Sequence, residues 1–210
     1  MELTVKLALY LLCAVSGYLF GCHNLAHTIS KKRGFDIRAV GSGNPGTSNA
    51  VITMGWKIGI LVGAHDIFKS LIPALLAAFL LPSLPLAAAV TGVASVLGHI
   101  FPAPLKFKGG KGFAPYVGMT FAVNWKFGLA VIVIVVLAIV ITDYLSVATF
   151  TTVISFPIYI ALFLCQYPLA AVVTVASVVI VWRHRENITR IANGTEIGFR
   201  SARKTKDSHH

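Results

Sequence analysis

The sequence predicts an all-α integral membrane protein with seven transmembrane helices, some of them short. Hydrophobic residues make up 56% of the 210-residue chain and only 12% of its residues are charged, against about 25% in soluble domains. The mean hydropathy is +0.79. Because the hydrophobic residues occur in long runs rather than alternating with polar ones, the composition excludes an ordinary soluble domain.

Seven apolar segments are candidates for the spans, since a helix needs about 20 apolar residues to cross a bilayer, or fewer where neighbouring protein shields its ends. They are residues 3–22, 56–81, 84–101, 113–123, 127–142, 145–164 and 168–182. We interpret the first as a retained transmembrane helix rather than a signal peptide, because no small-residue cleavage site clearly follows it. The fourth is short, and is either a half-helix or continuous with the fifth.

The chain shows no internal repeat and no separate soluble domain. We therefore expect residues 1–206 to form a single transmembrane domain. The tail, residues 207–210, ends in His209 and His210, which look like the remnant of an expression tag.

The basic residues are distributed unevenly over the predicted loops. If all seven segments cross, one side receives only Lys6 and Lys126, and the other receives every remaining Lys and Arg except Lys69. By the positive-inside rule the crowded side is cytoplasmic, which places the N-terminus outside and the C-terminus in the cytoplasm. If the fourth and fifth segments formed one span, the C-terminal tail and the first two polar loops would lie on opposite sides of the membrane. The charge pattern therefore favours seven crossings over six.

The formal charge of +11 does not indicate a nucleic-acid partner. The basic residues lie in short clusters beside apolar segments, where they meet anionic lipid head groups or anionic substrates. Cys13, Cys22 and Cys165 lack the CxxC spacing of a metal or disulfide site. We expect the lipid bilayer as a partner and no metal or other cofactor; the sequence does not predict an oligomeric state.

The first of three polar segments is residues 41–49, which read GSGNPGTSN. Glycine lets successive backbone N–H groups converge on one point, and short polar side chains add hydrogen-bonding groups, so we interpret the segment as an anion-binding loop. A flexible polar loop is the alternative for this stretch alone. Its glycine spacing matches the dinucleotide fingerprint, but the required βαβ unit does not fit between transmembrane helices.

The second polar segment, residues 98–112, contains His99 and a basic loop in which Lys108 and Lys111 enclose Gly109 and Gly110. A glycine-rich backbone lets ammonium groups and N–H dipoles close around phosphate oxygens. The alternative is a basic cluster at the membrane surface. The loop is not a Walker A motif, because glycine follows Lys111 where that motif has Ser or Thr.

Two ionisable residues, Asp66 and Lys69, lie inside the second apolar segment. Charged groups in hydrocarbon are costly and are usually paired or functional. Their three-residue spacing places them on one helix face, so we predict an intrahelical ion pair that supports the site. We expect His99 to be packed and hydrogen-bonded rather than to act as a base.

The third polar segment, residues 183–196, follows the last apolar segment and contains His184, Asn187 and Glu196. On a continued seventh helix His184 and Asn187 would share a face. His184 alone is equally consistent with an interfacial role, but beside Asn187 and three arginines we interpret it as functional. Glu196 either orients a basic group or caps a turn of the tail.

In these three segments the sequence resembles the bacterial acyl-phosphate:glycerol-3-phosphate acyltransferases of the inner membrane. That family has seven transmembrane helices and three motifs facing the cytoplasm, which are matched here by GSGNPGTSN, GHIFPAPLKFKGGKG and RHRENITRIANGTE in the same order and spacing. The resemblance covers residues 41–196. It implies transfer of a fatty acyl group from acyl phosphate to the 1-hydroxyl of glycerol 3-phosphate, which gives lysophosphatidic acid and phosphate in phospholipid synthesis.

The resemblance also implies roles for individual residues. The expected catalytic residues are Ser42, Lys111, His184 and Asn187. The expected substrate-binding residues are Gly43, Asn44, Gly46, Thr47, Ser48, Asn49, Lys108, Gly109, Gly110, Arg183, Arg185 and Glu196. Asp66, Lys69 and His99 are expected to support the site.

One departure from the family concerns Ile52, which stands where the first motif usually continues to an arginine. An aliphatic side chain cannot form the bidentate bond that arginine makes with phosphate. The departure leaves open a relative with a different phosphorylated acceptor, or weaker phosphate binding.

The expected reaction needs no covalent enzyme intermediate, because acyl phosphate is a mixed anhydride with a good leaving group. Either His184 or a substrate phosphate oxygen could take the hydroxyl proton. The usual acyltransferase pairing of a histidine with an aspartate four residues away is absent, so an acyl-CoA or carrier-protein donor is not expected. A transporter or binder of anions or lipid head groups is the rival from another class, which the lack of an internal repeat disfavours.

Overall fold

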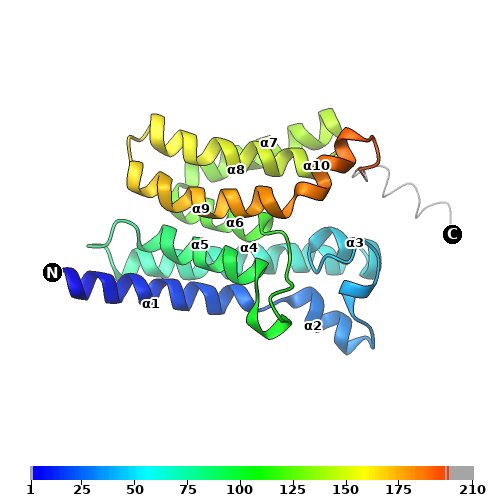
Figure 1. The fold of residues 1–210 in the computed structure, drawn as a ribbon, viewed down its shortest axis with the longest axis horizontal. Helices are drawn as coiled ribbons and strands as arrows, with labels where there is room; N and C mark the ends of the chain where they lie inside the picture. Colours follow the sequence, from blue (N-terminus) through cyan, green and yellow to red (C-terminus); the bar gives the residue numbers. More distant parts are fainter. Residues whose placement is uncertain (1, 197, 199–210) are drawn as a thin grey trace. The chain divides into compact units, whose positions relative to one another are not determined.

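The computed structural model describes residues 2–196 and 198, and within them the chain is all-α. The helices that correspond to the predicted spans are α1 (Leu3–Cys22), α4 (Trp56–Leu80), α5 (Ala87–Ile100), α6 (Phe113–Val123), α7 (Trp125–Thr142), α8 (Leu145–Leu162) and α9 (Tyr167–Arg183) (Figure 1). Each begins and ends within three residues of its prediction. The tail residues 207–210 lie outside the described part.

Five helical stretches are long and apolar enough to cross a membrane, namely α4, α7, α8 and the stretches Leu3–Lys32 and Ala87–Leu105. A sixth is possible if α9 and the following helix α10 (Arg185–Ala192) count as one span with a 50° bend. Helix α6 is apolar but shorter. The structure therefore shows an all-α, multi-pass membrane protein with five to six candidate spans, while the seventh crossing remains a prediction.

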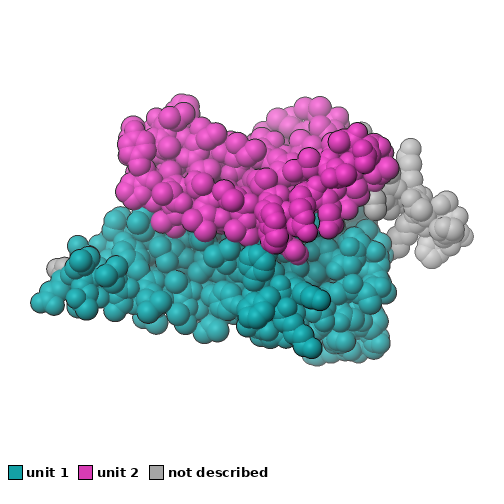
Figure 2. All heavy atoms as spheres, viewed as in Figure 1, with its two compact units in different colours: residues 1–125 teal, residues 126–210 magenta. Residues whose placement is uncertain are grey.

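The chain divides into two compact units, residues 1–125 and 126–210 (Figure 2). In the first unit, α1 packs along α5 through small residues. A Cβ on Gly17 or Gly21 would collide with the carbonyl of Thr91 or Ser95 on α5. Such close backbone approach is typical of helix pairs in membranes, where packing rather than hydrophobic exclusion drives association.

At one end of the first unit, short helices hold the first polar segment. Helices α2 (Leu25–Lys32) and α3 (Thr47–Met54), joined by the 3-10 turn η1 (Ile37–Ala39), lie beside the end of α4 (Figure 1). Ala26, Ile37, Ala50 and Val62 are fully buried together and form the apolar core of this arrangement. The polar segment is therefore packed against a transmembrane helix and does not hang from the bundle as a flexible loop.

The second unit contains α8 and α9, which pack against each other, and most of α7. Its chain turns by 50° at His184, between α9 and α10. The expectation that the seventh helix continues through Asn187 is therefore wrong. A cavity of about 560 Å³ lies in this unit, and its lining includes Phe127, Phe150 and Tyr159.

Candidate active site

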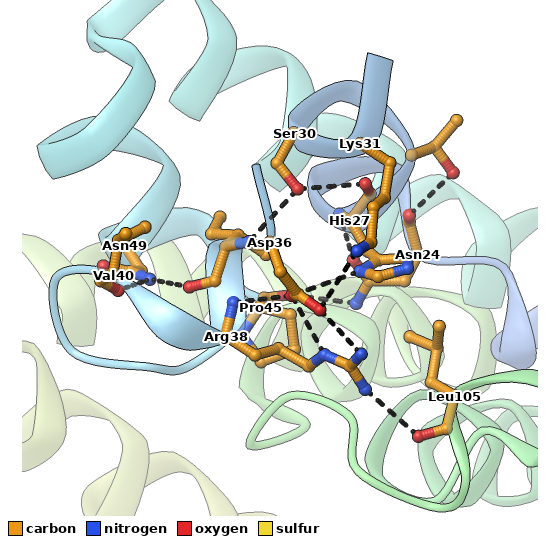
Figure 3. Close-up of polar contacts among 12 residues, drawn as sticks. Asn24, His27, Ser30, Lys31, Asp36, Arg38, Val40, Pro45, Asn49 and Leu105 are labelled. Carbon is orange, nitrogen blue, oxygen red and sulfur yellow. Dashed lines mark hydrogen bonds and ion pairs between the residues drawn. The ribbon is translucent and has the colours of Figure 1, made fainter. Parts of the chain in front are cut away.

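The first polar segment is only partly a loop, because Thr47, Ser48 and Asn49 form the first turn of α3. Asn49 is fully buried. Its Oδ1 accepts the backbone N–H of Ser42 at 2.9 Å. Its Nδ2 donates to the carbonyls of Ile37 and Val40 at 3.0 Å each, and Figure 3 shows Asn49 beside Val40. Asn49 thus fixes the shape of the segment from inside, which differs from the substrate contact that we expected.

The start of α3 offers the anion-binding geometry. Its N-cap is Gly46, which has no side chain to cap the helix, and the first intrahelical bond runs from the Ala50 N–H to the Gly46 carbonyl at 3.0 Å. The N–H groups of Thr47, Ser48 and Asn49 precede that bond and point out of the helix end. Such an end carries partial positive charge and is a ready site for phosphate.

The glycine N–H groups of this segment are used differently from our expectation. The Gly43 N–H donates to the Val40 carbonyl at 3.1 Å, and the Gly46 N–H donates to the Asn44 carbonyl at 2.9 Å. Gly41 and Gly43 have positive φ angles of 59° and 69°, a conformation that side chains disfavour. These glycines allow the turn, so the helix start, rather than a cradle of glycine amides, is the candidate anion site.

In the second polar segment, the two buried glycines pack against the end of α5. The Gly109 N–H donates to the Ile100 carbonyl and the Gly110 N–H to the His99 carbonyl, at 3.1 Å each. A Cβ on Gly110 would collide with the His99 ring. The protein itself therefore uses the N–H groups that we expected to bind phosphate, because they satisfy carbonyls at the helix end. The loop's two predicted phosphate-binding lysines differ in exposure, since Lys108 is exposed and Lys111 is partly buried.

Behind this loop, Lys69 forms the ion pair expected from the sequence, with 2.9 Å between its Nζ and Asp66 Oδ1. The ammonium group also lies 2.8 Å from the His23 carbonyl oxygen and 2.8 Å from His99 Nδ1. All three ammonium protons are thereby matched by acceptors. His99 is buried and hydrogen-bonded, and because its ring backs Gly110, the cluster connects α4 to the basic loop.

In the second unit, His184 lies at the bend between α9 and α10 and is only 5% exposed. Its Nδ1 donates to the Ile180 carbonyl at 2.8 Å. In the neutral ring this bond makes Nε2 the unprotonated nitrogen, which is the one able to accept a proton. The Phe150 ring meets His184 edge-on, with 5.8 Å between centroids.

Glu196 gathers the polar groups around α10. Its Oε1 accepts from Asn187 Nδ2 at 2.6 Å and from Ser146 Oγ at 3.1 Å, while its Oε2 accepts from Arg190 Nε at 2.7 Å. Of the two roles considered from sequence, the orientation of a basic group is the one present. Burial by itself raises the pKa of this carboxyl, but the three hydrogen bonds outweigh burial and bring the pKa of Glu196 below its ordinary value.

Ser146 was not identified from sequence. It lies in the first turn of α8, next to the short α7–α8 connection, and is 5% exposed. A serine at the start of an apolar span, directly after the polar turn at Asp143, is the only local signal that could have indicated it.

The two arginines beside His184 both lie near the Trp182 ring. Arg185 is exposed, with its guanidinium carbon 5.0 Å from the centroid of the Trp182 ring. An arginine over an exposed indole is typical of a cation–π pair at a membrane interface. Arg183 is the last residue of α9 and is partly buried.

The structure groups the predicted site residues by unit. Unit 1 brings Ser42 together with Asn49, and Lys69 with Asp66 and His99. Unit 2 brings Asn187 together with Glu196. Within residues 2–196 and 198, no three His, Cys, Asp or Glu side chains are arranged to hold a metal ion.

Comparison with known proteins connects this geometry to a family. The family model described as glycerol-3-phosphate acyltransferase matches residues 11–194. The glycerol-3-phosphate acyltransferase of Aquifex aeolicus (strain VF5) is 38% identical over 193 residues, which cover 90% of this chain and 98% of the relative. That of Geotalea daltonii is 36% identical over 187 residues, covering 89% of this chain and 95% of the relative.

Two crystal structures of PlsY (YgiH), an integral membrane glycerol 3-phosphate acyltransferase, share the fold. The glycerol 3-phosphate form has a TM-score of 0.83 and 36% identity, and the match covers 90% of this chain and 95% of that one. The lysophosphatidic acid form has a TM-score of 0.80 and 34% identity, with 92% and 97% covered. The chain therefore belongs to the integral membrane glycerol-3-phosphate acyltransferase family.

Proposed function

We propose that this chain transfers a fatty acyl group from acyl phosphate to the 1-hydroxyl of glycerol 3-phosphate, producing lysophosphatidic acid and inorganic phosphate. The observation that carries the proposal is the pair of solved relatives. One is the glycerol 3-phosphate form and the other the lysophosphatidic acid form of a single acyltransferase, at 36% and 34% identity over at least 90% of this chain. Glycerol 3-phosphate is the acceptor of this reaction and lysophosphatidic acid is its product.

Both substrates carry phosphate, and unit 1 offers two kinds of phosphate-binding group. The start of α3 provides the N–H groups of Thr47, Ser48 and Asn49, with the exposed Ser42 hydroxyl as a further donor. The second loop provides the ammonium groups of Lys108 and Lys111. An uncapped helix start binds anions through directed N–H groups, whereas lysine acts as a mobile point charge.

The reaction is an acyl transfer in which the 1-hydroxyl oxygen attacks the carbonyl carbon. The C–O bond to phosphate breaks, the phosphate leaves with its electron pair, and the hydroxyl proton passes to a phosphate oxygen or to His184 Nε2. We assign to Asn187 and His184 the positioning of glycerol 3-phosphate. Holding two reactants in line can supply roughly 7 to 11 kcal/mol of the barrier reduction, so positioning and charge stabilisation are the main tasks of the protein.

The acyl chain would lie among the helices. The cavity of about 560 Å³ in unit 2 is lined by apolar and aromatic side chains, including Phe150 and Ile158. Phe150 also meets the His184 ring, so within unit 2 an apolar space adjoins a histidine of the third motif.

For the topology we propose seven crossings of the bacterial plasma membrane, with the N-terminus outside and the site facing the cytoplasm. Two bonds within the units support this arrangement. Arg38 Nη1 donates to the Leu105 carbonyl at 3.3 Å, and Ser146 Oγ donates to Glu196 at 3.1 Å. With seven crossings, each of these pairs lies on the cytoplasmic side, where the basic residues gather.

Ile52 supports a second candidate, a family member that uses another phosphorylated acceptor. Ile52 lies on α3 and is 46% exposed, and its side chain carries no charge. If phosphate neutralisation depended on that position, glycerol 3-phosphate would bind weakly and a differently charged acceptor could compete.

The test supplies purified protein with palmitoyl phosphate and glycerol 3-phosphate, and measures inorganic phosphate and lysophosphatidic acid. We expect equimolar amounts of both, dependent on the acceptor, and no product when palmitoyl-CoA replaces the acyl phosphate. A folded sample that acylates another phosphorylated alcohol at least as fast would favour the second candidate. Absence of any acceptor-dependent release would rule out the proposal.

A further inference from the structure

We propose that Asp36 and Arg38 form a latch that sets the position of the basic loop, residues 106–112, relative to the first polar segment. Arg38 is then a positioning residue for phosphate binding. The inference rests on the proposed function for its kinetic consequence, but the latch itself is a property of the fold.

One side of the latch is a two-point ion pair. Arg38 Nη2 lies 2.8 Å from Asp36 Oδ2, and Arg38 Nε lies 3.1 Å from Asp36 Oδ1 (Figure 3). The backbone N–H of Arg38 also donates to Oδ1 at 3.0 Å, so Asp36 caps η1 at the same time. This geometry fixes the plane of the guanidinium group, unlike an exposed single-contact pair.

The other contact of the latch is with Leu105, the residue before the basic loop. Arg38 Nη1 donates to the Leu105 carbonyl at 3.3 Å, at the end of the 3-10 turn η2 (Ala103–Leu105). The next two residues, Lys106 and Phe107, have positive φ angles of 55° and 59°, a conformation that residues with side chains rarely adopt. The latch therefore holds the carbonyl immediately before the turn that directs the chain towards Lys108 and Lys111.

Residues 36–40, which include the latch, are also hydrogen-bonded to the first polar segment, residues 41–49. Asn49 donates to the carbonyl of Ile37, which lies between the two latch residues, and to that of Val40, and it accepts the Ser42 N–H. Asn24 Nδ2 donates to the Pro45 carbonyl at 2.9 Å. Residues 36–40 are thus bonded to Asn49 at the start of α3 and, through Arg38, to Leu105, the residue before the basic loop (Figure 3).

A direct role for Arg38 in phosphate binding is less consistent with these contacts. Each of its three side-chain nitrogens already donates to a protein acceptor, so phosphate could use only the two N–H groups that remain on Nη1 and Nη2, beside the Asp36 carboxylate. Hydrogen bonding to Arg38 also keeps the pKa of Asp36 well below its ordinary range, so the latch persists at neutral pH. Lys31, 3.5 Å from Asp36 and half exposed, adds a weaker contact.

The test compares Arg38→Lys with Arg33→Lys, a matched change at an exposed arginine of the same connection. Lysine keeps the charge but cannot bind Asp36 at two points and reach Leu105 as well. We expect the KM for glycerol 3-phosphate to rise about tenfold in Arg38→Lys, the loss typical of one charged hydrogen bond, with kcat changed little. A smaller folded fraction alone would lower apparent kcat and leave KM unchanged.

Asp36→Asn should raise the KM for glycerol 3-phosphate by a similar factor. The double variant should show little further increase in KM over either single variant.

A second readout tests the latch without turnover. Limited trypsin digestion of folded protein cleaves after Lys106 or Lys108 only when the loop leaves its bound conformation. Cleavage there should be faster in Arg38→Lys and Asp36→Asn than in the wild type or Arg33→Lys. If the wild type has no acyltransferase activity but cleavage is still faster in the two latch variants, the proposed function is wrong and the latch is confirmed. Unchanged cleavage, or an unchanged KM in an active Arg38→Lys, would overturn the latch.

Discussion

The two glycine-containing loops of unit 1 look alike in sequence but use glycine for different physical purposes. In the first loop, Gly41 and Gly43 take positive φ angles that turn the chain towards the start of α3. In the second, Gly110 is buried without a positive φ, and its missing Cβ makes room for the His99 ring. A glycine-rich sequence therefore does not by itself indicate amides that bind phosphate; the first loop offers a helix start and the second offers lysines.

The largest effect that this comparison predicts is at Lys111. If the second loop binds phosphate through charge alone, Lys111→Ala should lower kcat/KM by about 100-fold or more, as for other groups that stabilise developing charge. Steady-state rates with palmitoyl phosphate measure this. Near-normal rates in the variant would contradict a role for Lys111 in phosphate binding.

The next largest effect is on stability, and it separates a glycine needed for close packing from a glycine needed for a positive φ angle. Gly110→Ala forces a side chain into the His99 ring, and overpacking of this kind costs about 3 kcal/mol. Gly34→Ala is the control for strain alone, because Gly34 has a positive φ of 83° and nothing within 4 Å of an added Cβ; it should cost about 1 kcal/mol. Thermal unfolding in detergent measures both. Equal losses would mean that the close approach to His99 is unimportant.

A smaller effect is expected at Ser42. Its backbone N–H is held by Asn49, so Ser42→Ala should keep the loop conformation and remove only a hydroxyl. Loss of one hydrogen bond to a charged phosphate should lower kcat/KM about tenfold. Ser42→Thr, which retains a hydroxyl, is the matched variant and should recover part of the activity; equal loss in both would point to loop shape instead.

The smallest effect is that of pH on stability between about pH 5 and 8. Hydrogen bonds from Arg38 lower the pKa of Asp36, and hydrogen bonds lower that of Glu196 despite its burial. A carboxyl with a depressed folded pKa contributes stability above its unfolded value of about 4, and this contribution is lost as the pH falls through the folded value. The contribution of these two carboxyls to the unfolding temperature should therefore be constant from about pH 8 to 5 and fall below about pH 4. In Asp36→Asn the acid decline should be shallower, and an unaltered decline would mean that the latch does not contribute to it.

The long helices could be predicted from sequence because uninterrupted apolar runs leave the backbone no alternative to helix in a bilayer. The short helices α2, α3 and α10 could not. Helices of this length are unstable alone, and α3 depends on tertiary burial of Ala50 against Val62. The bend at His184 also lacks a proline or glycine at that position that would have indicated it.

The candidate site shows the same division between local and long-range information. The Asp66–Lys69 pair follows from its spacing along one helix. The contacts of Lys69 with His99, of Arg38 with Leu105 and of Ser146 with Glu196 join residues at least 30 positions apart, and no local pattern encodes them. Asn49 was expected to bind substrate because of the family resemblance of its segment; only the fold reveals that its side-chain amide bonds to the protein's own backbone.

The most direct test of the different roles of the two loops is to follow their amides as glycerol 3-phosphate is added. Protein labelled with ¹⁵N at glycine, serine and threonine reports on Thr47 and Ser48 in the first loop and on Gly109 and Gly110 in the second. We predict that the amide signals of Thr47 and Ser48 shift downfield and saturate together, while those of Gly109 and Gly110 change little because they remain bonded to the end of α5. Large saturating shifts at Gly109 and Gly110, with none at Thr47 and Ser48, would contradict the account.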